Sequence, residues 1–223
     1  LELFFEMKRI YIFLIFLLST GCSLDSSRVA PGYIEAFKSI NNVLFGFEES
    51  PISADLIKNI PYASMTVKMG NGPRGLLILE SKIFQENIWV SADEIYIKEK
   101  NGKIIQTKGL NNNLEELEHT VDFADLKNVD TMRTYLYYKS FSNPTLKNLP
   151  LTARFSIKEK SLVKLINREI PLTLIEETIT STDLGWEFVN QYWIDDNSFV
   201  WKSSQRVSPR LPVIEFEITK KPS

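Results

Sequence analysis

The chain offers very few side chains that could act as nucleophiles or as soft metal ligands. Its 223 residues include one histidine, His119, and one cysteine, Cys22. Serine and cysteine hydrolases commonly activate their nucleophile with a histidine, and zinc sites of the His and Cys type need several such ligands. His119 follows a run of glutamates, and we interpret it as a solvated residue. The sequence therefore predicts no catalytic histidine, no metal site and no cofactor.

Paired carboxylates are the remaining route to catalysis, because two of them about 5–10 Å apart can hydrolyse glycosidic bonds. Asp195 and Asp196 are adjacent and are followed by Asn197 and Ser198. Residues of these types form turns between strands, so we interpret the four as a hairpin loop. A glycan-modifying enzyme that uses two more distant carboxylates remains the alternative function.

The amino-terminal segment carries a signal that concerns location. Lys8 and Arg9 precede nine apolar residues, Ile10 to Leu18, and Ser19-Thr20-Gly21-Cys22 follows. A charged region, a short apolar run and small residues before a cysteine are typical of a bacterial lipoprotein signal. The run is too short to span a bilayer, which takes about 20 residues.

This signal divides the chain into three parts. Residues 1–21 are predicted to be the signal peptide, with Leu1 to Glu6 upstream of the true start. Residues 22–30 are predicted to be a lipidated tether. Residues 31–223 are predicted to form a single β-rich periplasmic domain.

Cys22 is the predicted lipidation site. Several acyl chains on one residue give stable membrane anchoring. Ser23, the next residue, favours the outer membrane, with the domain on its periplasmic face. An ordinary cleaved signal with an incidental cysteine is the alternative interpretation.

The formal net charge of −2 gives no electrostatic reason to expect nucleic acid as a partner.

The remaining sequence predicts an all-β fold. Residues 31–45 have apolar side chains at helical spacing and predict one N-terminal amphipathic helix. A capped helical turn is predicted at 53–56 and a short helix at 114–119. From Ser64 onward, about ten strands are predicted, arranged as an antiparallel sandwich or an open barrel. Asn101-Gly102 predicts a tight hairpin, because these residue types tolerate the positive φ that such turns require.

Two predicted strands near the carboxyl terminus combine aromatic rings with amides and hydroxyls. With residues 195–198 as the loop between them, Tyr192 is expected opposite Trp201 and Asn190 opposite Ser203. The period of two then turns Trp201 inward with Tyr192, and it turns Trp193 outward.

Aromatic rings beside amides and hydroxyls suit sugars, which stack on rings and need fixed polar partners. The competing interpretation is that these rings fill a β core. The residues predicted to bind glycan or a partner are Trp89, Asn190, Gln191, Tyr192, Trp193, Trp201, Lys202 and Gln205.

Ordered motifs are spread along the chain, namely NIPYAS at 59–64, WVSAD at 89–93, NGKI at 101–104, NQYW at 190–193 and VWKSSQ at 200–205. In this order the chain resembles the YjbF/GfcB-type group 4 capsule polysaccharide lipoproteins. The resemblance implies an all-β outer-membrane lipoprotein encoded with capsule or exopolysaccharide secretion machinery. It supplies no catalytic residues, and Gln191 stands where the family pattern leads us to expect arginine.

We therefore expect a non-enzymatic accessory of capsule or exopolysaccharide export at the periplasmic face of the outer membrane. Its expected partners are that membrane, through the lipid anchor, and either polysaccharide or envelope secretion proteins.

Overall fold

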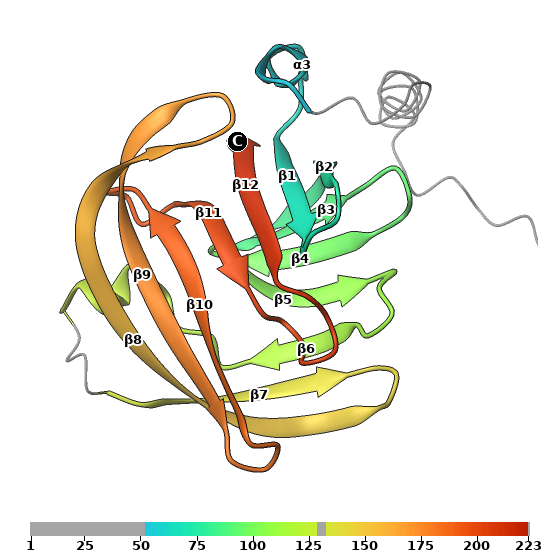
Figure 1. The fold of residues 1–223 in the computed structure, drawn as a ribbon, viewed down its shortest axis with the longest axis vertical. Helices are drawn as coiled ribbons and strands as arrows, with labels where there is room; N and C mark the ends of the chain where they lie inside the picture. Colours follow the sequence, from blue (N-terminus) through green and yellow to red (C-terminus); the bar gives the residue numbers. More distant parts are fainter. Residues whose placement is uncertain (1–51, 129–132, 223) are drawn as a thin grey trace, which may run out of the picture. The chain divides into compact units, whose positions relative to one another are not determined.

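The computed structural model describes residues 52–128 and 133–222 (Figure 1). All of them fall in one compact unit. The helix predicted at 31–45 and the predicted anchor Cys22 lie outside the described residues. The elements are α3 (Ala54–Lys58), β1 (Ser64–Met69), β2 (Arg74–Ile83), β3 (Glu86–Val90), β4 (Tyr96–Lys100), β5 (Lys103–Lys108), β6 (Leu114–Glu118), the 3-10 turn η2 (Asp125–Asn128), β7 (Tyr135–Phe141), β8 (Leu146–Lys164), β9 (Glu169–Ser181), β10 (Trp186–Ile194), β11 (Val200–Gln205) and β12 (Ile214–Lys220).

The strands form one antiparallel sheet in the order β5-β4-β3-β2-β1-β12-β11-β10-β9-β8-β7-β6. Strands that follow one another in sequence pair throughout, apart from β5 and β6, and the ring continues where β1 pairs with β12. The sheet curls into a nearly closed barrel (Figure 1). The all-β prediction is confirmed, with twelve strands among the described residues where about ten were expected.

Strands β5 and β6 face each other across a seam that side chains bridge. The amide of Leu114 donates to Thr107 Oγ1 at 2.9 Å, and Gln106 Nε2 donates to the carbonyl oxygen of Glu115 at 3.0 Å. Both strands end the hydrogen-bonded order, so the seam interrupts the backbone ladder around the barrel.

The strand directions give the barrel two distinct ends. We call the entry end the one where β1 begins at Ser64 and β12 finishes at Lys220, which are paired. The turns β2–β3, β4–β5, β8–β9 and β10–β11 lie at this end, because each strand runs antiparallel to its neighbour. The turns β1–β2 and β9–β10 lie at the opposite end, which we call the far end.

Two local predictions are confirmed. Ser53 caps α3, and its hydroxyl accepts a hydrogen bond from the amide of Leu56 at 3.2 Å. Asn101 and Gly102 form the two-residue turn between β4 and β5, with φ of 50° and 82°. Gly102 also packs against Val200, which a Cβ would approach to 2.3 Å, so only glycine fits there.

The helix predicted at 114–119 is wrong, because residues 114–118 form strand β6. Leu114 and Leu117 are three residues apart, which is helical spacing. A register shift between Leu114 and Glu116 changes the phase of the strand, and both leucines are buried. A β-bulge therefore reproduces a spacing that otherwise indicates a helix.

The hairpin β8–β9 bends over toward β12 at the entry end (Figure 1). The amide of Ile166 donates to the Glu217 carboxylate, and Arg168 Nη2 donates to the carbonyl oxygen of Thr219 at 2.7 Å. Leu165 is buried at this bend. The hairpin thus covers the outer side of β12, which explains how Glu217 becomes buried on an outward-facing position.

Candidate functional site

The barrel interior holds a buried ion pair between Lys103 and Glu177. Lys103 directly follows the Asn101–Gly102 turn, and Glu177 lies on β9 between the buried residues Ile175 and Ile179. The two side chains are 3% and 1% exposed, and Lys103 Nζ donates to Glu177 Oε1. A buried charge is costly unless it is paired, so each residue depends on the other.

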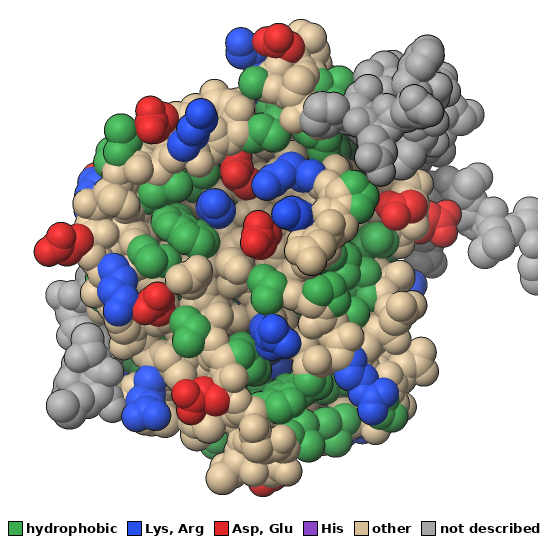
Figure 2. All heavy atoms as spheres, in the orientation of Figure 1, with side chains coloured by type: hydrophobic (Ala, Val, Ile, Leu, Met, Phe, Trp, Pro, Cys, Tyr) green, Lys and Arg blue, Asp and Glu red, His purple; other side chains and the backbone are tan. Residues whose placement is uncertain are grey.

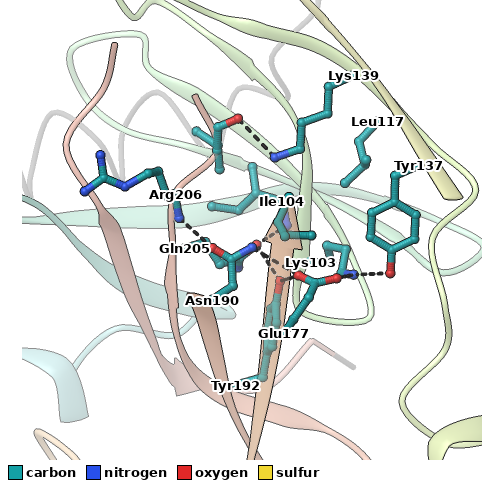
Figure 3. Close-up of a pocket in the computed structure, with 12 residues that line it drawn as sticks. Lys103, Ile104, Leu117, Tyr137, Lys139, Glu177, Asn190, Tyr192, Gln205 and Arg206 are labelled. Carbon is teal, nitrogen blue, oxygen red and sulfur yellow. Dashed lines mark hydrogen bonds and ion pairs between the residues drawn. The ribbon is translucent and has the colours of Figure 1, made fainter. Parts of the chain in front are cut away.

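Three further groups complete the hydrogen bonding of this pair (Figure 3). Asn190 Nδ2 and Tyr192 Oη donate to Glu177 Oε2 at 3.0 and 2.8 Å. Lys103 Nζ also donates to Tyr137 Oη at 2.9 Å. We call Lys103, Tyr137, Glu177, Asn190 and Tyr192 the interior polar cluster.

Electrostatics keep the carboxylate of Glu177 ionised. Burial raises its pKa, but the charge of Lys103 and the hydrogen bonds from Lys103, Asn190 and Tyr192 outweigh burial, and the net effect lowers the pKa. For Lys103 burial lowers the pKa, and Glu177 opposes this effect. The pKa of Tyr192 rises well above its usual value through burial and the nearby charge of Glu177, so Tyr192 remains a hydrogen-bond donor.

Aromatic rings surround the ammonium of Lys103. Its Nζ lies 4.5 Å from the ring centroid of Tyr137, 5.2 Å from that of Phe155, 5.8 Å from that of Tyr192 and 5.9 Å from that of Phe123. Such distances allow cation–π attraction. The protein's own lysine therefore occupies an arrangement of rings that could otherwise hold a cationic ligand.

Gln205 ties this cluster to the edge strand β5. Its Oε1 accepts from the amide of Ile104 at 3.0 Å, and its Nε2 donates to the carbonyl oxygen of Gly102 at 2.9 Å. The cavity beside the cluster leaves free space for about one water molecule. A sugar ring does not fit this interior as it stands, and the side chains of Gln205, Asn190 and Tyr192 make their hydrogen bonds within the barrel.

Trp89 belongs to a second buried polar group, formed by β3 and β4. Its indole nitrogen donates to Glu99 Oε1 at 3.4 Å, and the amide of Gly102 donates to Glu99 Oε2 at 2.6 Å. Asn87 also donates to this carboxylate. Burial raises the pKa of Glu99, and these hydrogen bonds partly offset the rise. Trp89 is 0% exposed, so it has no surface to offer a glycan.

Trp201 lies at the entry end, on a largely buried side of the hairpin. Its indole nitrogen donates to Asp195 Oδ2 at 3.0 Å, and the cations of Arg168 and Lys221 lie 4.7 and 4.6 Å from its rings. Asp195 also accepts from the amides of Asn197 and Phe199 at 2.9 and 3.1 Å. The carboxylate of Asp195 therefore shapes the loop, in line with the hairpin interpretation.

The outer side of β10 and β11 brings together three predicted residues. Trp193 pairs directly with Lys202, whose Nζ lies 5.0 Å from its ring centroid. Gln191 Nε2 donates to Glu176 Oε1 at 3.2 Å, and Glu176 also pairs with Lys158 at 3.0 Å. We call the half-exposed Gln191, Trp193, Lys202 and Glu176 the outer β10 patch. Figure 2 shows basic, acidic and apolar side chains interspersed on the face that it views.

The predicted register of this hairpin is wrong, although Trp201 is buried and Trp193 is half-exposed, as the prediction required. Tyr192 pairs with Ser203, and Gln191 pairs with Ser204, because the register shifts between Trp193 and Ile194. The loop is accordingly one residue longer, from Asp195 to Phe199. The bulge also turns Val200 inward, which strict alternation along the strand did not predict.

No sequence motif predicted the interior positions of Lys103, Tyr137, Glu177 and the neighbouring Lys139. One signal was present, because Glu177 and Lys139 occupy inward positions of strands whose other inward residues are mostly apolar. Across the described ranges, no three His, Cys, Asp or Glu side chains gather in a way that could hold a metal ion. In the same ranges no helix has the length and apolar character needed to cross a membrane.

Comparison with known proteins places this barrel in a class of envelope lipoproteins. Residues 37–219 match the family described as group 4 capsule polysaccharide lipoprotein GfcB, YjbF. This match covers most of the chain, so the chain belongs to that family, and the resemblance seen in the sequence is confirmed.

Curated relatives and a solved structure agree with this assignment. The uncharacterized lipoprotein YjbF of Escherichia coli (strain K12) is 24% identical over 202 residues, which are 89% of this chain and 91% of YjbF. The uncharacterized lipoprotein GfcB of the same strain is 23% identical over 194 residues, 82% and 83% of the two chains. The crystal structure of the hypothetical lipoprotein YmcC from Escherichia coli (K12) has a TM-score of 0.71 at 20% identity, over 84% of this chain and 96% of YmcC. That likeness establishes the fold.

Proposed function

We propose that this chain is a non-enzymatic accessory of capsule or exopolysaccharide export, anchored through Cys22 at the periplasmic face of the outer membrane. Its membership of the capsule polysaccharide lipoprotein family, over residues 37–219, carries the proposal. In this role it binds polysaccharide or an envelope secretion protein while its acyl chains hold it at the membrane.

The packing of the barrel supports a role in binding over one in catalysis. Glu177 is paired with Lys103 and accepts two further hydrogen bonds, and Glu99 accepts hydrogen bonds from Trp89 and Gly102. These interior carboxylates are committed to the fold. The cavity beside Glu177 has room for about one water molecule.

The outer β10 patch is the binding surface in this proposal. It combines the ring of Trp193 with the amide of Gln191 and the cation of Lys202. A sugar can stack its C–H face on such a ring and bind its hydroxyls to the flanking polar groups. Trp193 contributes partly to the core, so the polar members are the better targets for mutation.

The test is export of surface polysaccharide in a strain that lacks this gene and is complemented with variants. The wild-type gene should restore the amount and the chain length of the surface polysaccharide. The double variant Gln191→Ala, Lys202→Gln should restore markedly less while retaining the wild-type melting temperature. The control Glu187→Gln changes an exposed side chain near the opposite end of the same strand and should restore export fully.

Deletion that leaves surface polysaccharide unchanged in amount, length and location would refute the export role. Full complementation by the double variant would refute the role of the outer β10 patch while leaving the export role intact. A pull-down of the lipidated protein from detergent-solubilised envelopes then identifies whether glycan or protein is recovered.

A further inference from the structure

The turn between β2 and β3 exposes two large apolar side chains. Ile83 is 56% exposed and Phe84 is 94% exposed. Phe84 is the first residue of the two-residue turn between the paired residues Ile83 and Glu86, and its φ is +54°. Glycine suits this position best, because a Cβ is strained at positive φ. The turn requires the positive φ, but it does not require an aromatic side chain there, so turn formation leaves the exposed ring of Phe84 unexplained.

The position of this tip within the barrel indicates what it contacts. Ile78 pairs with Ser64, the first residue of β1, and β2 continues five residues further to Ile83. At about 3.3 Å per residue the tip projects about 15 Å beyond the start of β1. Strand β1 also begins at this end, so the segment that carries the predicted anchor, which precedes β1 in the sequence, joins the barrel here.

Further apolar and basic side chains are exposed at the entry end. Lys82 is exposed beside Ile83, and Lys164 and Lys220 are exposed near the ends of β8 and β12. Leu162, near the end of β8, is 65% exposed. Apolar side chains flanked by lysines are typical of surfaces that bind the headgroup region of a bilayer, especially where lipids are anionic.

We propose that Ile83 and Phe84 insert into the interfacial region of the bilayer leaflet that holds the lipid anchor, with Lys82 at the level of the headgroups. About 30 residues separate Cys22 from Ile52, and even with the predicted helix at 31–45 a segment of that length can reach about 70 Å. The anchor alone therefore leaves the distance of the domain from the membrane open, and the tip fixes it. This inference depends on lipid anchoring and not on the export role.

The first experiment uses the lipidated protein in vesicles of phosphatidylethanolamine and phosphatidylglycerol. Because Cys22 is the chain's one cysteine and would be acylated, Phe84→Cys provides a single thiol for an environment-sensitive fluorophore. Its emission should shift to the blue, and nitroxide-bearing lipids should quench it. The control Leu184→Cys labels an exposed position in the β9–β10 turn at the far end and should show neither change. Equal, water-like emission from both positions would overturn the proposal.

The second experiment removes the apolar tip without harming the turn. In the mature chain carrying Cys22→Ser, Phe84→Gly should lower partitioning into the same vesicles about 10-fold, as expected for one aromatic side chain. Its melting temperature should stay equal or rise, because glycine relieves the strain at positive φ. Leu184→Ser should leave partitioning unchanged. Unaltered partitioning of Phe84→Gly would overturn membrane insertion and would leave a protein partner as the occupant of the tip.

Discussion

Replacing the buried Lys139 by methionine is expected to stabilise the protein near neutral pH. Lys139 lies on β7 with 3% exposure, and its Nζ donates to the carbonyl oxygen of Val207 at 3.2 Å. Burial lowers its pKa from 10.5 to about 8, with Glu177 opposing and Lys103 reinforcing the shift. The difference corresponds to about 3 kcal/mol of unfavourable free energy for the charged form in the folded state.

The pH dependence of this penalty follows from which state binds the proton more tightly. The unfolded chain holds the proton up to pH 10.5, and the folded chain releases it above about pH 8. The penalty is therefore complete below pH 8, declines between pH 8 and 10.5, and is absent above that range. Between pH 8 and pH 10.5 the free energy of unfolding therefore rises with pH, because the penalty from Lys139 declines.

Lys139→Met keeps most of the side-chain volume and removes the charge. The lost hydrogen bond to Val207 costs about 1 kcal/mol, so the net gain at pH 7 should be about 2 kcal/mol. Urea denaturation followed by tryptophan fluorescence measures the gain at pH 7 and pH 9.5, and at pH 9.5 it should fall below about 1 kcal/mol. The control Lys158→Met alters an exposed lysine and should change stability little. A loss of stability at pH 7, or a gain that is equal at both pH values, would refute this reasoning.

Three further predictions concern the core and the anchor. Glu177→Leu should lower the free energy of unfolding, measured by urea denaturation, by about 3–5 kcal/mol, because it leaves Lys103 as an unpaired buried charge. Adding Lys103→Met should recover part of this loss. Purely additive effects of the two substitutions would contradict the pairing. Trp89→Ala should lower the free energy of unfolding by about 3–5 kcal/mol. A decrease of less than about 1 kcal/mol would show that this ring is not part of the core. Cys22→Ala should move the mature protein into the soluble fraction without changing its melting temperature, and protein that stays with the membrane would indicate contacts stronger than the reversible binding of the tip.

Local turn chemistry allowed parts of the fold to be predicted from the sequence. Asn101 and Gly102 have the residue types of a tight turn, and both adopt the positive φ that it requires. Ser53 likewise caps the helical turn that its residue type predicts. These features depend on a few consecutive residues, which are visible in the sequence.

Bulges and long-range pairs were not predictable in this way. The register shifts in β6 and between β10 and β11 change the phase of a strand, and alternation cannot be extrapolated across them. Lys103 and Glu177 are 74 residues apart, so nothing local joins them before the barrel closes. For the same reason, Trp89 and Gln205 had the residue types of a binding surface but lie within the core.

The arrangement of the seam and the chain ends has a consequence for the connectivity of the fold. Since Ser64 pairs with Lys220, the two ends of the described domain lie at the same end of the barrel and can be joined by a short linker. Opening the loop between β5 and β6 would then place the new termini at the two strands that already end the sheet order. In this circular permutant every paired strand would be the sequence neighbour of its partner, so the fold would become an uninterrupted meander of lower contact order. Such a chain is expected to fold faster than the natural one, which must bring β1 to β12 before its ring of strands can form.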